Sequence, residues 1–228
     1  MRLSRLAVLP LVLALFASAA PAAPRRAPLP TDLPLAGAGP DSFLVEYTTT
    51  KGRFVTRSVR AWAPLGVDRY FHLVNGGYYD GRVIYRVGET KSVKGGRVVQ
   101  FGQTGDTLVD RAWERATLAD EPAVHPRRAG AGGFARGGPA TRSTEMAFTT
   151  NEATALDTVS WQGVTGFPVV AVVVEGLDVL TRFEGRWGNA PIESDSLSIA
   201  GLAWLEQRFP GLDRIQRARV LKRWGGVR

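Results

Sequence analysis

The sequence contains no cysteine and only two histidines, His72 and His125. Without cysteine the chain forms no disulfide, binds no metal through thiolates and carries no lipid-modified cysteine. Two histidines do not supply a typical histidine metal site or the machinery of a Ser-His hydrolase, so no metal and no cofactor are expected. Lysine is rare as well, with four lysines and 25 arginines in 228 residues and a net charge of +8. Aromatic residues do not alternate with the basic clusters as a stacking platform would require, so nucleic acid is not an expected partner.

The first 40 residues carry the features of a targeting segment. Arg2 and Arg5 precede an apolar run of 15 residues, 6–20, which small residues follow. A transmembrane helix needs about 20 residues, so this run is short for one. We predict a signal peptide over residues 1–23, a flexible linker over residues 24–40, and a periplasmic or secreted protein that meets the membrane only during export. An uncleaved membrane anchor is the alternative.

Residues 42–75 show the patterns of a hairpin followed by a helix. Apolar and polar residues alternate over 42–49, a turn follows, and residues 54–61 form the return strand. Pro64 is suited to the first turn of a helix. The helix has one apolar face, at the spacing expected of a buried side: Val67, Tyr70, Phe71 and Val74. His72 lies beside this face, which predicts a structural role.

A glycine-rich turn and a strand follow over residues 76–87, Gly-Gly-Tyr-Tyr-Asp-Gly-Arg-Val-Ile-Tyr-Arg-Val. Gly76 and Gly77 are able to close a helix through positive φ. Arg86 lies in the otherwise apolar strand, and the pattern alone leaves two interpretations. The arginine is exposed at a strand edge, as charged residues generally are, or it is a fixed cation at the rim of an apolar groove.

This turn and strand resemble a segment of the cyclophilin-type peptidyl-prolyl cis-trans isomerases, and the chain is similar to a divergent, exported bacterial member. Further landmarks follow in the family order, at residues 51–54, 63–64, 98–102, 105–106, 134–148, 166–168 and 173–180. The resemblance implies a mainly β domain over residues 41–189, a closed eight-stranded antiparallel barrel capped by helices. Residues 190–228 would form a short helical C-terminal extension packing on the barrel, and a monomer is expected.

The resemblance also implies the residues of the site. Arg86 matches the arginine that acts on the prolyl amide, and Gln100 matches the glutamine that orients it and the substrate carbonyl. The substrate-binding positions carried over from the motifs are Val98, Ala135, Arg136, Glu145 and Ala147.

The sequence departs from the family pattern in the proline pocket. Ala147 stands where the resemblance places a phenylalanine, and strand alternation sends Phe148 to the opposite face. Arg97 stands near the position of another pocket aromatic. Glu145 replaces a glutamine, and we expect it to pair with Arg86 and compete with substrate.

Three functions follow from these residues. The first is a peptidyl-prolyl cis-trans isomerase that acts on X-Pro bonds of exported polypeptides and assists their folding. The second is a catalytically impaired cyclophilin-like module that binds proline-containing peptides or acts as a chaperone. The third is a basic surface binder on the same fold, whose binding would weaken steeply with salt. Arg86 and Gln100 favour the first function, whereas Ala147, Arg97 and the lengthened polar loop at residues 88–96 favour the second.

Overall fold

The computed structural model describes residues 26–90, 93–193 and 196–226, so the predicted signal peptide lies outside the described residues. Eight strands form one antiparallel sheet: β1 (Ser42–Thr49), β2 (Gly52–Val59), β3 (Ile84–Glu89), β4 (Arg97–Phe101), β5 (Ala131–Phe134), β6 (Met146–Thr149), β9 (Ala171–Glu175) and β10 (Ile215–Trp224). A separate two-stranded hairpin consists of β7 (Ser160–Trp161) and β8 (Val164–Thr165). The helices are α1 (Pro64–Asn75), α2 (Thr107–Glu114), α3 (Leu177–Thr181), α4 (Ala190–Glu193) and α5 (Ser196–Arg208), with 3₁₀ turns η1 (Pro30–Asp32), η2 (Arg60–Trp62) and η3 (Thr154–Asp157). In the described part of the chain, no helix combines the length and the apolar character needed to cross a membrane.

The predicted hairpin and helix are confirmed as β1, β2 and α1. The apolar face of α1 is buried in the main core, as its periodicity predicts. His72 is 4% exposed, and its Nε2 lies 2.7 Å from the carbonyl oxygen of Gly37, which confirms the structural role. The glycine-rich turn after α1 buries both tyrosines, and their hydroxyls donate to the carbonyl oxygens of Gly102 (Tyr78, 2.9 Å) and Thr144 (Tyr79, 3.0 Å).

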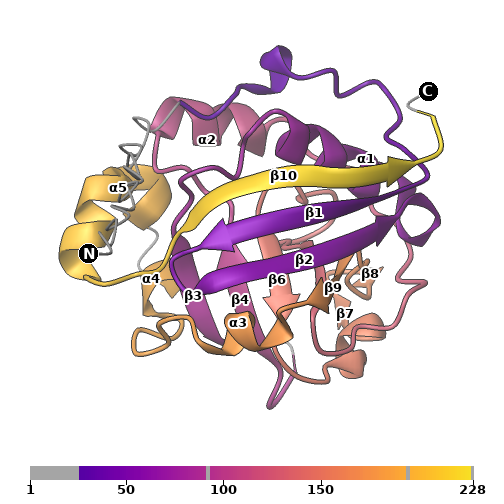
Figure 1. Ribbon diagram of the computed structural model, residues 1–228. Coiled ribbons are helices and arrows are strands. Elements are labelled where there is room, and N and C mark those ends of the chain that lie inside the picture. The colour runs from indigo at the N-terminus through magenta and orange to yellow at the C-terminus, as the bar shows by residue number, and fades with distance from the viewer. Residues whose placement is uncertain (1–25, 91–92, 194–195, 227–228) are drawn as a thin grey trace, which may run out of the picture.

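The sheet is an open half-barrel, which corrects the closed barrel that the family resemblance implied. The strand order is β10-β1-β2-β9-β5-β6-β4-β3, and β10, β1 and β2 lie side by side at the front of Figure 1. Among the described residues, the two edges of the sheet are joined by an isolated bridge between Val83 and Arg214, the residues just before β3 and β10. Beyond this bridge, residues 188 and 189 pack against the edge of β3 at Gly88. The contact is close: a Cβ atom on Gly88 would lie 2.8 Å from Asn189 Oδ1. This stretch is not a strand, so it does not continue the ladder around the barrel.

Aromatic side chains fill the interior of the half-barrel. Tyr47 and Phe54 stack with ring centroids 4.6 Å apart, and Phe101 and Phe148 stack at 6.0 Å. All four side chains are at most 1% exposed. Gly132 lies opposite Phe148 in the neighbouring strand, and a Cβ atom there would collide with the Phe148 ring. Phe148 therefore belongs to the core, on the face opposite Ala147, as strand alternation predicts.

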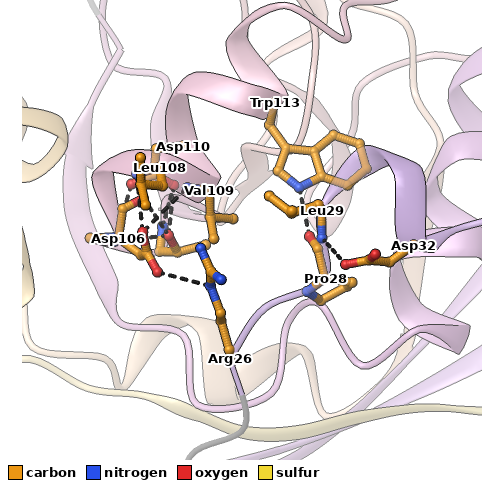
Figure 2. A network of polar contacts seen from close by, with 11 residues as sticks. Arg26, Pro28, Leu29, Asp32, Asp106, Leu108, Val109, Asp110 and Trp113 are labelled. Carbon is orange, nitrogen blue, oxygen red and sulfur yellow. Dashed lines mark hydrogen bonds and ion pairs between the residues drawn. The ribbon is translucent and has the colours of Figure 1, made fainter.

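Residues 26–40 pack on the domain, which differs from the flexible linker expected over 24–40. The Nε1 of Trp113 in α2 donates to the carbonyl oxygen of Pro28 at 2.9 Å, and Arg26 pairs with Asp106 at the start of α2 (Figure 2). Further along, the backbone N–H of Gly39 donates to a carboxylate oxygen in α1. The composition of this segment predicted flexibility. Instead the segment runs past α2 and α1 (Figure 1), and hydrogen bonds from both helices hold it in place.

Residues 190–228 contain a strand as well as helices, which corrects the short helical extension that was expected. In the C-terminal half of α5 and after it, Leu205 and Phe209 form a small buried cluster with Val83 and Tyr85. The chain then forms β10, which pairs with β1 along its whole length. The sequence hid this strand because β10 is an edge strand whose exposed positions are mostly charged, as is usual for protected sheet edges.

Candidate active site

The predicted catalytic residues lie in one row across four strands. Arg86 of β3 is paired with Gln100 of β4, Gln100 with Ala147 of β6, and Ala147 with Gly133 of β5. Residues paired directly across an antiparallel sheet project to the same face. The row therefore lies on the outer face, while neighbouring residues such as Phe148 fill the core.

This row lines a pocket of about 540 Å³. Six of the seven predicted site residues are among its lining: Arg86, Val98, Gln100, Ala135, Arg136 and Ala147. Glu145 is not among them and lines a neighbouring cavity of about 240 Å³, which shares Ala135 with the pocket. The structure thus brings the predicted residues together, whereas the roles assigned to them stay predictions.

Arg86 is held in place by three hydrogen bonds. Its Nε donates to Asn189 Oδ1 at 2.8 Å, Nη1 donates to Gln100 Oε1 at 3.0 Å, and Nη2 donates to the carbonyl oxygen of Glu89 at 2.8 Å. Burial lowers the pKa of Arg86. A guanidinium has five N–H donors, so one N–H on each terminal nitrogen is left for a bound molecule. Of the two interpretations of Arg86, the structure supports the fixed cation in a groove.

Glu145 contacts Gln100 and does not pair with Arg86, which corrects the expected ion pair. Its carboxylate accepts hydrogen bonds from the Tyr85 hydroxyl at 2.6 Å, from Gln100 Nε2 at 2.8 Å and from Gln103 Nε2 at 3.2 Å. Gln100 lies between the two charged groups, with its amide oxygen toward Arg86 and its amide nitrogen toward Glu145. These two bonds fix which way the amide of Gln100 points.

Several residues of the site were missed by the sequence analysis. The other lining residues are Thr90, Arg127, Gly133, Phe134, Leu156, Phe167, Ile192 and Glu193. Gly133 directly precedes the family motif at residues 134–148, and its position beside this motif could have indicated that it lines the pocket. Arg127 and Asn189 come from connecting segments, and no local pattern indicates that such segments reach the pocket.

The acidic and histidine side chains do not gather around the pocket. Among the described residues, no group of three or more His, Cys, Asp or Glu side chains is arranged to hold a metal ion. The arrangement that is present consists of fixed hydrogen-bond donors beside an apolar wall formed by Val98, Phe134 and Ala147. Such a site is suited to binding and polarising an amide.

The comparisons with known proteins agree with this geometry. The model of the family described as cyclophilin type peptidyl-prolyl cis-trans isomerase/CLD matches residues 44–198. The chain belongs to this family. Its membership makes the protein an enzyme of the peptidyl-prolyl cis-trans isomerase class, and the family match covers every strand of the row that carries Arg86 and Gln100.

Solved structures support the cyclophilin fold. One is a cyclophilin type peptidyl-prolyl cis-trans isomerase from Cryptosporidium parvum, with a TM-score of 0.51 and 14% sequence identity over 79% of this chain and 98% of that chain. At this identity the likeness shows the fold alone. A search of curated proteins found no match.

Proposed function

We propose that this cyclophilin catalyses cis-trans isomerisation of X-Pro bonds with Arg86 and Gln100 as its catalytic residues. The observation that carries the proposal is the fixed Arg86–Gln100 pair at the pocket, with spare donors on both side chains. No acid, base or metal is needed for this reaction, because no covalent bond is made or broken.

The barrier to rotation arises from amide resonance and amounts to about 18–20 kcal/mol. Uncatalysed X-Pro isomerisation takes tens to hundreds of seconds. In the twisted state the prolyl nitrogen becomes pyramidal and gains a lone pair. A spare N–H of Arg86 donated to this nitrogen stabilises the twisted state more than the planar ground state, which is what accelerates the rotation. Because three hydrogen bonds already orient Arg86, little reorganisation is needed during the reaction.

Gln100 would hold the substrate in register with Arg86. Its Nε2 carries two hydrogens, and one is donated to Glu145. The second hydrogen is left for a carbonyl oxygen of the substrate. The proline ring would lie against the apolar wall that includes Val98 and Ala147.

The setting and substrates of the enzyme are part of the same proposal. We infer an exported, monomeric bacterial protein that acts on exported polypeptides and assists their folding. Support for export comes from the basic and apolar pattern of residues 1–23. Ala27, close behind the predicted signal peptide, is 6% exposed and so already belongs to the folded domain.

A second candidate function is binding of proline-containing peptides with little catalysis. It is favoured by the small side chains opposite one another in the pocket, Ala147 and Gly133, where the family places an aromatic residue at the position of Ala147. Loss of an aromatic contact weakens binding of the proline ring. Turnover and binding therefore have to be measured separately.

The deciding experiment is the rate of cis-to-trans isomerisation of a short X-Pro peptide, followed by NMR exchange with and without protein. We expect acceleration by the wild type and loss of nearly all of it in Arg86→Ala, which should still be folded and melt cooperatively. The matched control is Arg217→Gln, which removes an exposed arginine of β10. Equal rates in wild type and Arg86→Ala would refute the catalytic assignment, and peptide binding without acceleration would establish the second function.

A further inference from the structure

A buried arginine lies in the wall of the pocket, and its guanidinium has no hydrogen bond to a carboxylate in the described part of the chain. Arg127 is 2% exposed, and its guanidinium donates to the carbonyl oxygens of Ala147 at 3.4 Å, Phe167 at 3.2 Å and Pro168 at 3.4 Å. Its Nε has no hydrogen-bond partner among the described residues. Asp157 is close, but both of its carboxylate oxygens accept from the backbone N–H of Arg127 and not from the guanidinium. The positive charge of Arg127 is therefore incompletely neutralised.

The small residues of the central row create the space for this guanidinium. A Cβ atom on Gly133 would lie 2.5 Å from Nη2 of Arg127 and would collide with the carbonyl oxygen of Pro168. Ala147, directly opposite Gly133, likewise has a small side chain. Arg127 thus occupies room beside the position where an aromatic side chain is expected in this family.

A second arginine adds to the positive charge of the same pocket. The side chain of Arg136 is 1% exposed, and its guanidinium lies 4.6 Å from the ring centroid of Phe167. Its Nη2 donates to the carbonyl oxygen of Val164 at 3.0 Å, whereas Nε and Nη1 have no hydrogen-bond partner among the described residues. The nearest carboxylate oxygen, on Asp120, is 4.0 Å from Nη1. This ion pair is at the limit of direct contact.

The charges do not balance within the pocket. Arg86, Arg127 and Arg136 line it, and Glu193 is the acidic residue among the described lining residues. Burial lowers the pKa of Arg127 to about 10, so the group still carries its charge near neutral pH. Burying a cation without a counter-ion is costly unless another group supplies the negative charge. Charges act strongly over short distances in a low-dielectric cavity, even where the nitrogen atoms themselves are enclosed.

We propose that this pocket binds a carboxylate of the peptide substrate together with its proline, so that the enzyme prefers X-Pro peptides with an acidic residue next to the proline. The inference deepens the proposed function and rests on it. A volume of about 540 Å³ is within the range of small-ligand pockets, about 300–1,000 Å³, and exceeds the need of one proline ring.

The test compares peptides that differ in one group. Peptides capped at both ends carry Glu before the proline, Glu after it, or Gln at both positions, and a fourth peptide has Gln at both positions with a free C-terminal carboxylate. Binding to the purified protein is measured by calorimetry and isomerisation by NMR exchange. We expect at least one Glu peptide to bind about tenfold more tightly than the capped Gln peptide, because the uncompensated arginine charges attract a carboxylate across the low-dielectric cavity. A gain confined to the fourth peptide would assign the carboxylate to the chain terminus.

Variants then identify the arginines responsible. Arg136→Gln and Arg127→Gln should each remove most of the preference for the acidic peptide, measured as the ratio of the affinities for the Glu peptide and the capped Gln peptide in the same variant. Arg217→Gln, which removes the same charge far from the pocket row, should keep the preference. Because Arg127→Gln removes buried hydrogen bonds and the variant is at risk of unfolding, its melting curve is recorded, and Arg136→Gln serves as the independent variant.

The outcomes separate this inference from the proposed function. Equal binding of all four peptides by the wild type overturns the carboxylate site, even if every peptide is isomerised. A preference that is the same in Arg136→Gln, Arg127→Gln and Arg217→Gln also overturns it, because it would come from overall charge. Tighter binding of the acidic peptides without isomerisation of any peptide supports the site and refutes the proposed catalysis.

Discussion

All five tyrosines of the sequence are buried, and this predicts a steep loss of stability at alkaline pH. Each is at most 1% exposed: Tyr47, Tyr70, Tyr78, Tyr79 and Tyr85. Burial is the largest cause that raises the pKa of every one of them above the ordinary value of 10.0. In the unfolded chain the hydroxyls lose their protons near pH 10, whereas the folded protein retains them. The stabilisation is therefore complete below pH 10 and is lost as the pH rises above it.

The magnitude follows from the number of groups. Each pH unit above the unfolded pKa lowers the free energy of unfolding by about 1.4 kcal/mol for each group that stays protonated in the folded state. Five such groups give about 7 kcal/mol per pH unit, comparable to the whole stability of a typical domain, about 5–15 kcal/mol. We expect the protein to unfold cooperatively within about one or two pH units above 10, with tyrosinate formation in the same transition.

The assay is a titration in which tyrosinate absorbance and tryptophan fluorescence are recorded on the same sample. The matched control is Tyr70→Phe, which removes one ionising hydroxyl and its contact with the Tyr47 hydroxyl at 2.7 Å. This variant should release four protons instead of five in the transition, so the pH dependence of its stability is one-fifth less steep. Gradual ionisation of the tyrosines near pH 10 with folded fluorescence retained would refute the burial argument.

Three further substitutions test the site and the packing. Glu145→Ala leaves the Tyr85 hydroxyl without its partner, so we expect the free energy of unfolding to fall by about 1–3 kcal/mol and kcat/KM by about tenfold. Glu145→Gln is the control, and unchanged melting and turnover in Glu145→Ala would contradict the role. Gly132→Ala places a methyl group against the Phe148 ring, which should lower stability by about 1–3 kcal/mol in a urea melt, and an unchanged midpoint would contradict the contact. Trp113→Phe removes the hydrogen bond to Pro28 and should speed limited proteolysis within residues 26–40, whereas unchanged cleavage would show that other contacts hold the segment.

Local patterns predicted those parts of the fold whose causes lie within a few residues. The hairpin of β1 and β2, the buried face of α1 and the opposite orientations of Ala147 and Phe148 follow from periodicity alone. The assignment of Arg86 to a groove required the family resemblance, because the strand pattern fits an exposed arginine equally well. The structure resolves this choice through contacts with Gln100 on the neighbouring strand and with Asn189, which is 103 residues further along the chain.

Sequence patterns failed where long-range contacts override composition. Residues 26–40 have the composition of a linker, yet a hydrogen bond from Trp113 fixes Pro28 on α2. The basic sequence of β10 gives little sign of a strand, because its pairing partner β1 comes from the other end of the sequence. Hydrogen-bonding groups of an exposed segment find partners only after the rest of the chain has folded, so no local rule predicts them.

The sequence by itself determined the family, the strand that carries Arg86 and the small residues at the centre of the pocket. The tertiary structure decided that the half-barrel is open, that Glu145 orients Gln100 without pairing with Arg86, and that Arg127 lies behind Ala147 and Gly133. The physical reason is that a residue type specifies which interactions a side chain is able to make. Only the folded chain specifies which partners come within hydrogen-bond distance and which charges are left without one.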